Sequence, residues 1–394
     1  MTALERFHGA FPARPTAGSR ASDDVARFIP AHERPVWAAA YHLCTVARTK
    51  GTDRRVSIVM PAYNAEATIG TALRSLLAQE SAFSREIIVV DDGSTDRTAE
   101  IAESFEAVRV IRQSNAGPAV ARNAGVEAAG SEIVLFIDSD CEASPDWLDT
   151  MLEPFANDRV SGVKGAYRTR QREFAARFVQ LEYEDKYDRM ARHEFIDFVD
   201  TYSAAFRREV FATSGGYSSE FTTACAEDVD LSYRMERAGA KMVFRPTAIV
   251  YHRHPDRLGA YLRKKFRFAM WRVLAVKRNP EKLISDSHTP QMQKVQALAA
   301  PAVAALAVAS PVVPYAGLAS AVLGGAFAAS TIPFTVKAVR KDRAVGVAAP
   351  VLLFLRGLAQ GAGLATGVVR LLRPTSVRSP ATAVASGASD RSIG

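Results

Sequence analysis

Cysteine is scarce in this chain of 394 residues. The three cysteines, Cys44, Cys141 and Cys225, lie far apart, and none belongs to a CxxC pair or to another spacing typical of metal ligands. This pattern argues against a disulfide framework and against a structural zinc site. We therefore expect reduced thiols in a cytosolic compartment.

An apolar stretch is also missing where a secretory signal would stand. Such a signal needs an apolar core of about 7–15 residues, and the first 24 residues contain no such run. Their arginines are scattered among alanine, serine and proline. We therefore expect a flexible extension over residues 1–55 instead of a cleaved leader.

Acidic residues are the minority, with 42 Asp and Glu against 50 Lys and Arg and a net charge of +8. A basic protein can bind nucleic acid, anionic lipid or phosphorylated ligands, so the position of the charge must decide. A dense basic cluster lies in residues 256–290, where Phe266, Phe268 and Trp271 are interleaved with Lys and Arg. A cationic groove with stacking aromatics would suit single-stranded nucleic acid. A basic amphipathic helix would suit an anionic membrane surface.

The membrane interpretation is favoured because charge disappears soon afterwards. Residues 295–336 contain no charged residue in 42 positions, and one crossing of a bilayer needs about 20 apolar residues. Two spans fit, so this region is predicted to form a transmembrane hairpin rich in small residues, which membrane helices use for close packing. We accordingly expect residues 256–290 to form an interfacial helix whose partners are membrane lipids and not nucleic acid. The cations of this helix would also suit a bound pyrophosphate group.

The last part of the chain is again apolar. Residues 344–372 carry only Arg356 and Arg370 as charges and are predicted to be a third membrane-associated segment: a span, a re-entrant piece or an interfacial helix. Residues 373–394 have the composition of a disordered tail. Eight Lys and Arg precede the first span and four follow the second, which places both flanks in the cytoplasm. We expect a multi-pass protein of the cytoplasmic (inner) membrane with residues 56–255 facing the cytosol.

Residues 56–255 alternate short apolar runs with amphipathic segments. This alternation predicts an α/β fold with a mostly parallel sheet and helices on both faces. The predicted strands are residues 56–61, 86–90, 108–111 and 132–137. Ligands of such sheets bind at the carboxyl ends of the strands, where this sequence places AYN, DDGS and DSD.

Two pairs of aspartates stand at these strand ends. Asp138 and Asp140 share one face of an extended chain, and hard oxygen ligands of this kind suit Mg²⁺ or Mn²⁺. Alone, such a pair more often only ends a strand, and Asp91 and Asp92 alone read as a turn. Together, four carboxylates at neighbouring strand ends repel one another unless a cation or donor groups offset them.

Two further clusters follow later in the chain. Glu227 and Asp228 stand at the mouth of a predicted helix, where they either cap it or provide a carboxylate base. His252 and His254 follow a predicted strand and point to one face if extended. They are either structural or complete a metal site, and the residues alone leave the two interpretations about equal.

Four segments resemble family 2 glycosyltransferases with the GT-A fold, in order and in spacing. They are VSIVMPAYNAEATIGTALRSLLAQ, EIIVVDDGSTDRTAEIA, NAGPAVARNAGVEAAGSEIVLFIDSD and AEDVDLSYRMERAG. The resemblance covers roughly residues 55–255 and implies a Rossmann-like, nucleotide-diphospho-sugar transferase domain over 56–255. It implies metal-dependent, inverting transfer of a hexose-like sugar to a membrane lipid, a lipid-linked glycan or a cell-surface glycan.

The resemblance also implies a role for each candidate residue. Asp228, with Glu227 beside it, would be the general base, and Asp140 would bind the Mg²⁺ or Mn²⁺ that bridges the diphosphate. His252 or His254 would be a further metal ligand. The nucleotide sugar would be held by Pro61, Ala62, Tyr63, Asn64, Glu66, Asp91 or Asp92, and Asp138.

One feature of chain-extending members of this family is missing. Those synthases carry QxxRW on an interfacial helix, and this chain has FRFAMWR in about that region. We therefore expect single, non-processive transfer. The alternative from another class is a non-catalytic nucleotide-sugar-binding subunit of a membrane glycan-assembly complex, although such a subunit has no need to keep a base.

Overall fold

The computed structural model describes residues 55–220, 226–280 and 290–372. The predictions of a flexible extension and of a disordered tail lie outside these residues, apart from Arg55, where the first strand begins. All described residues belong to one compact unit.

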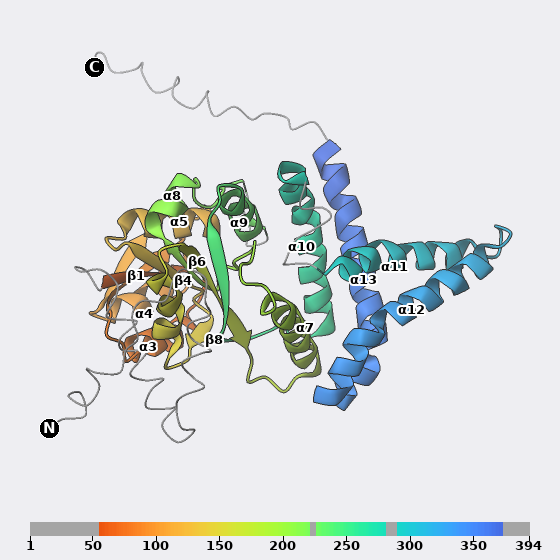
Figure 1. Cartoon of the computed structure of the whole chain (residues 1–394), viewed down its shortest axis with the longest axis horizontal. Coiled ribbons are helices and arrows are strands. Elements are labelled where there is room, and N and C mark those ends of the chain that lie inside the picture. Colours follow the sequence, from red (N-terminus) through yellow and green to blue (C-terminus); the bar gives the residue numbers. More distant parts are fainter. Residues whose placement is uncertain (1–54, 221–225, 281–289, 373–394) are drawn as a thin grey trace, which may run out of the picture. The chain divides into compact units, whose positions relative to one another are not determined.

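An eight-stranded mixed sheet forms the centre of the sheet region, residues 55–252 (Figure 1). Strands β1, β2, β3 and β4 are parallel, β7 runs antiparallel to β4 and β6, and β6 pairs in parallel with β8. The predicted mostly parallel α/β sheet is confirmed. In spatial order the strands are β3 Val108–Arg112, β2 Ser84–Asp91, β1 Arg55–Ala62, β4 Ile133–Ile137, β7 Ser203–Arg207, β6 Val160–Arg168, β8 Lys241–His252 and β5 Cys141–Ala143.

The central strands are apolar along nearly their whole length because helices cover the sheet. Ile58, Val59 and Met60 of β1 have no exposed surface. Helix α5 approaches β1 so closely that a Cβ on Gly125 would overlap the side chain of Val59. The helices of this region are α3 Ile69–Leu77, α4 Thr98–Glu103, α5 Pro118–Ala128, α6 Trp147–Leu152, the 3₁₀ turn η1 Glu153–Ala156, α7 Phe174–Met190, α8 Arg208–Thr213 and α9 Glu227–Arg237.

Four long helices follow the sheet: α10 Leu258–Arg278, α11 Gln291–Ala309, α12 Ala316–Lys341 and α13 Arg343–Leu372. Helix α10 lies in the basic segment. In the described part of the chain, α11, α12 and α13 are long and apolar enough to cross a membrane. Helices α11 and α12 lie side by side as a hairpin that points away from the sheet (Figure 1).

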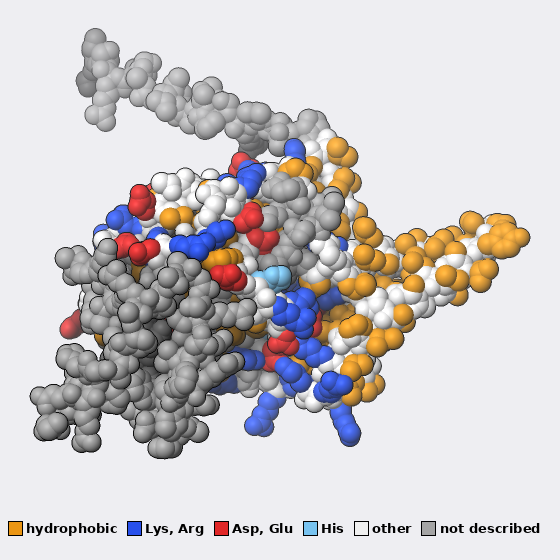
Figure 2. Space-filling model, viewed as in Figure 1, with side chains coloured by type: hydrophobic (Ala, Val, Ile, Leu, Met, Phe, Trp, Pro, Cys, Tyr) orange, Lys and Arg blue, Asp and Glu red, His pale blue; other side chains and the backbone are white. Residues whose placement is uncertain are grey.

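The surface of this hairpin differs from that of the sheet region. Figure 2 shows apolar side chains along the whole hairpin, with charged ones gathered at its base. At the tip, Val312 is 82% exposed and Tyr315 is 84% exposed. Apolar surface of this extent marks a site that lipid or a partner covers.

Candidate active site

The loops after β1 and β2 are joined to each other by Asn64 and Glu66. The backbone N–H of Asn64 donates to Ser94 Oγ (3.0 Å), and the N–H of Thr95 donates to Asn64 Oδ1 (2.9 Å). Asn64 has a φ of 48°, a left-handed turn conformation that asparagine tolerates. The N–H of Arg97 donates to Glu66 Oε2 (3.1 Å). These two predicted site residues therefore shape the edge of the sheet.

The other predicted donor-binding residues lie at the same edge. Pro61 and Ala62 are buried at the end of β1, and the carbonyl of Ala62 accepts the N–H of Asp92 (2.8 Å). Tyr63 follows and is half exposed. This arrangement leaves an accessible aromatic ring beside two rigid loops.

Asp91 and Asp92 are both buried, but their surroundings differ. Asp92 accepts hydrogen bonds from the side chain of Gln113 (2.7 Å) and from the N–H groups of Ala116 (2.9 Å) and Gly117 (2.8 Å). It thereby ties the end of β2 to the loop that starts α5. Asp91 accepts a long bond from the N–H of Ser94 (3.4 Å).

A buried arginine joins two of the predicted clusters. The guanidinium of Arg122 donates to Asp138 (2.8 Å) and to Glu227 (3.1 Å). Burial opposes its charge, but Asp138 and then Glu227 raise the pKa of Arg122 above its usual value. One permanent cation thus lies between the first acid of DxD and the AED segment.

Arg122 was missed in the sequence, although a signal exists. The buried side of α5 carries Ala119, Ala121, Gly125 and Val126, and Arg122 occupies the same side. An arginine on the apolar side of a helix needs a buried acidic partner. That periodicity identifies Arg122 as an exception, but it does not identify its partners.

Asp228 stands in the first turn of α9 and is half-buried. Burial, followed by the negative charge of Glu227, raises the pKa of Asp228 to about 7. Glu227 is buried more deeply, and its carboxylate also accepts the N–H of Ala226 (3.1 Å). A carboxylate that titrates near neutral pH is suited to take up a proton.

Asp140 and His252 come together through strand pairing. Cys141 of β5 lies opposite His252 of β8 in the register. The Nδ1 of His252 is 3.4 Å from a carboxylate oxygen of Asp140, and the ligand atoms of Asp140, Cys141 and His252 all lie within 4.8 Å of one another. That buried Nδ1 makes no hydrogen bond in the structure. The carboxylate and the imidazole fit a divalent cation.

His254 has different neighbours. Its Nε2 is 3.1 Å from Gln180 Oε1, and its ring is stacked on Tyr183. Burial, followed by the charge of His252, lowers the pKa of His254 to about 3. Of the two predicted histidines, only His252 is in the cluster with Asp140 among the described residues.

An aromatic stack supports His252. The ring of Tyr167 is stacked on His252 at 4.6 Å between centroids and on Tyr202 at 3.3 Å. Behind it, buried Lys164 forms an ion pair with Asp200 and a hydrogen bond with Tyr202 (2.9 Å). The residues behind His252 come from β6 and from the segment just before β7, for which the sequence pattern predicted no strand.

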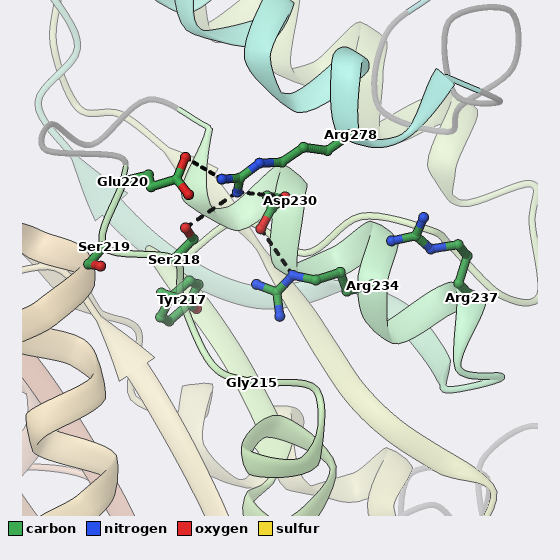
Figure 3. Close-up of a pocket in the computed structure, with 9 residues that line it drawn as sticks. All are labelled: Gly215, Tyr217, Ser218, Ser219, Glu220, Asp230, Arg234, Arg237 and Arg278. Atoms are coloured by element: carbon green, nitrogen blue, oxygen red, sulfur yellow. Dashed lines mark hydrogen bonds and ion pairs between the residues drawn. The ribbon is translucent and has the colours of Figure 1, made fainter. Parts of the chain in front are cut away.

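A cavity of about 530 Å³ lies beside Arg122. Figure 3 shows the residues that line it. Its wall includes Tyr217, whose ring is 5.7 Å from the guanidinium carbon of Arg122. Asp230 pairs with two of the wall's arginines, Arg234 (3.0 Å) and Arg278 (3.5 Å). Glu220 also pairs with Arg278, so two carboxylates lie beside the three arginines of the cavity wall.

The chain also matches known proteins. Residues 57–215 match the family model described as glycosyl transferase family 2. An uncharacterised glycosyltransferase of Escherichia coli (strain K12), YibD, is 40% identical over 105 residues, or 26% of this chain and 30% of that protein. Pre-mycofactocin glycosyltransferase of Mycobacterium tuberculosis is 30% identical over 243 residues, or 59% of this chain and 49% of that protein. The chain thus spans less than half the length of either relative.

A solved structure extends the likeness to the fold. The mannosyltransferase PcManGT from Pyrobaculum calidifontis, in complex with GDP-Man and Mn²⁺, superposes with a TM-score of 0.55 at 20% identity. The match covers 82% of this chain and 94% of that chain. The GT-A fold expected for residues 56–255 is confirmed.

Proposed function

Since residues 57–215 match the family 2 glycosyltransferase model, we propose that the chain transfers a sugar from a nucleotide diphosphate donor, with inversion, to a membrane lipid, lipid-linked glycan or cell-surface glycan. The observation that carries the proposal is the buried bridge from Asp138 through Arg122 to Glu227. It connects a donor-site acid with the segment that holds Asp228. Both ends of a transfer reaction therefore lie in one place.

The donor is assigned to the carboxyl edge of the sheet. Pro61, Ala62, Tyr63 and Asn64, with Glu66 and Asp91, form the site for base and ribose, and exposed Tyr63 offers a face for stacking. Asp92 holds the neighbouring loop. Asp138 is assigned to the ribose and donor-sugar hydroxyls, and the GDP-Man complex of PcManGT supports a sugar nucleotide.

A divalent cation is assigned to Asp140 and His252. When bound, Mn²⁺ or Mg²⁺ offsets the charge that develops on the leaving diphosphate. The clustered ligand atoms and the Mn²⁺ bound to PcManGT support this assignment. The thiol of Cys141 is a softer donor that neither cation prefers, so we give it no ligand role.

Asp228 is assigned as the base. The acceptor hydroxyl oxygen attacks the anomeric carbon, the bond from that carbon to the diphosphate oxygen breaks, and the hydroxyl proton passes to the Asp228 carboxylate. The pKa of about 7 matches this role near neutral pH. Glu227 contributes its charge and its anchor on Arg122, and we assign it a positioning role.

The acceptor and the location follow from the apolar helices. Three candidate membrane helices follow α10 in the chain, so an acceptor with a lipid portion is reached without leaving the membrane surface. The cations that flank the hairpin favour the cytosolic face of the inner membrane. We infer single transfer, because QxxRW is missing from the basic helix.

The test uses the full chain in lipid nanodiscs. Binding of GDP, UDP and dTDP with and without Mn²⁺ identifies the nucleotide, and the matching donors are then tested for turnover on a lipid extract. Asp228→Asn should lower kcat about 10²–10⁴-fold and leave nucleotide binding unchanged. Asp158→Asn, on an exposed loop, is the matched control.

Two outcomes would contradict the proposal. Full turnover in Asp228→Asn would remove the base assignment. If the native chain binds a nucleotide in a Mn²⁺-dependent manner but turns over no donor, the non-catalytic subunit becomes the better interpretation.

A further inference from the structure

Helix α13 lies along α10, and the two helices run in the same direction (Figure 1). A Cβ on Gly363 would overlap the carbonyl oxygen of Phe266, and one on Gly367 would crowd that of Met270. The residue numbers rise together on both helices, so the pair is parallel. Because α10 and α13 touch over a full helical turn, the contacting parts of the two helices lie at the same depth in any membrane that they meet.

Near its middle, α13 is fastened to the catalytic region. Arg356 is buried and forms an ion pair with Glu182 of α7 (2.7 Å). Two groups of α10 reach the same carboxylate, Lys265 (3.0 Å) and the hydroxyl of Tyr261 (2.8 Å). Just before α13, Asp342 pairs with Arg177 of α7 (2.6 Å). The first half of α13 therefore follows α7 and α10 together.

This arrangement conflicts with a third span. If α13 crossed a bilayer, its middle would lie near the midplane, and Glu182, Lys265 and the length of α10 would lie there too. Helix α10 has seven lysines and arginines in 21 residues. Charged side chains at the bilayer centre are costly, and neither α7 nor α10 is among the described helices that are long and apolar enough to cross.

The side of α13 that faces away from these contacts is apolar and open. Val347 is 77% exposed and Leu372 is 78% exposed, one near each end. In α13, 39% of the most apolar stretch is buried, against 17% in α11 and 11% in α12. Helix α13 thus has one side packed against the protein and one apolar outer side that is open to lipid.

We propose that α13 is an interfacial helix which lies beside α10 in the membrane surface, on the side of the catalytic region. Its valine-bearing side meets the acyl chains, while the cations of α10 meet anionic headgroups. The α11–α12 hairpin is then the part that enters the hydrocarbon. The C-terminal end of α13 then lies on the same side of the membrane as the catalytic region.

The first test determines which side of the membrane the end of the chain faces. A cysteine is appended after Gly394, and Asp158→Cys, in an exposed loop of the catalytic region, serves as the reference. Both variants are treated with a membrane-impermeant maleimide in sealed inverted and right-side-out vesicles. Labelling of the chain without an added cysteine measures the contribution of the native cysteines and is subtracted. Labelling of both positions from the same face supports the interfacial helix. Labelling from opposite faces overturns it.

A second test measures depth. A nitroxide label is attached to a single cysteine introduced by Val347→Cys, Ala362→Cys or Leu372→Cys. The full chain carries Cys44→Ser and Cys225→Ser and keeps Cys141, which is buried. Each variant is reconstituted in neutral and in anionic phospholipid. Val347 and Ala362 are about 22 Å apart along the helix. Collision with oxygen and with a nickel chelate should place all three labels at about 5–10 Å depth. A label at Ala362 clearly deeper than both ends contradicts the proposal. Neither test depends on turnover, so the proposed transfer reaction can fail without affecting them.

Discussion

Two buried arginines, one in the sheet region and one in the C-terminal helices, show how differently these regions use the same group. Arg122 lies between Asp138 and Glu227, both of which belong to the candidate active site. Arg356 lies between Glu182 of α7 and Gln296 of α11 (2.5 Å), neither of which is a candidate site residue. A buried guanidinium needs acidic or amide partners in either setting. What differs is whether those partners belong to the proposed active site.

The comparison separates positioning from anchoring. Arg122 holds Asp138, the acid proposed for the donor, and Glu227, the neighbour of the proposed base, at a fixed separation. Arg356 holds α13, the helix proposed to meet lipid, against α7. Loss of Arg122 should lower both the turnover rate and the stability of the fold. Loss of Arg356 should lower only the stability and change how α13 lies in the membrane.

Arg122→Met is expected to have the largest effect, because it leaves two carboxylates near one another without their cation. Removing one member of a buried ion pair costs about 3–5 kcal/mol, measured as the change in the free energy of unfolding of the full chain in detergent. Turnover should fall as well. Arg122→Lys keeps one charge but not the forked geometry, so it should recover stability more than kcat. Wild-type stability in Arg122→Met would show that the bridge is unimportant.

The two histidines provide the next prediction. His252→Ala should weaken Mn²⁺ affinity by at least about 10–100-fold, the loss found even for groups one layer removed from a metal. His254→Gln is the matched control, since its ring bonds to Gln180 and not to Asp140; its Mn²⁺ affinity should stay within about threefold of wild type. Calorimetric titration of Mn²⁺ in the absence of donor measures both. Equal losses in the two variants would refute the assignment to His252.

Much of the site could be predicted because its signals are local. Four strands follow from apolar runs, and Asp91, Asp138 and Asp140 follow from the rule that ligands bind at the ends of parallel strands. The partners could not be predicted in this way. Arg122 and Glu227 are 105 positions apart in the chain, and only the packing of α5 and α9 joins them. A helical pattern can identify Arg122 as unusual without naming its partner.

The same reason explains two choices that the sequence left open. His252 and His254 are equivalent until β5 pairs with β8 and places Cys141 opposite His252. The apolar segment 344–372 fits a span, a re-entrant piece or an interfacial helix by composition. The contact of Arg356 with Glu182, across 174 positions, is what leads us to propose the interfacial helix. Register and long-range packing decide such questions, and neither is visible in a local pattern.

Arg356→Met tests the anchoring side of the comparison. Glu182 keeps Lys265 and Tyr261 as partners, so the expected loss of stability is smaller than for Arg122→Met, about 1–3 kcal/mol. It should appear as a lower Tm of the full chain in nanodiscs, with kcat on a detergent-soluble acceptor unchanged. A fall in kcat as large as that of Arg122→Met would erase the distinction between the two arginines.

The pH dependence of kcat/KM gives the smallest and most specific effect. A base must be deprotonated, so with a pKa of about 7 for Asp228 the rate should fall about tenfold for each pH unit below 7 and level off above it. Glu227→Gln removes the neighbouring negative charge that helps to raise this pKa, so the acidic limb should move to lower pH. Arg356→Met should leave the profile unchanged, because Arg356 is not among the charges that set this pKa. The profiles are measured at saturating Mn²⁺. If the acidic limb shifts in Arg356→Met but not in Glu227→Gln, the titrating group is not Asp228.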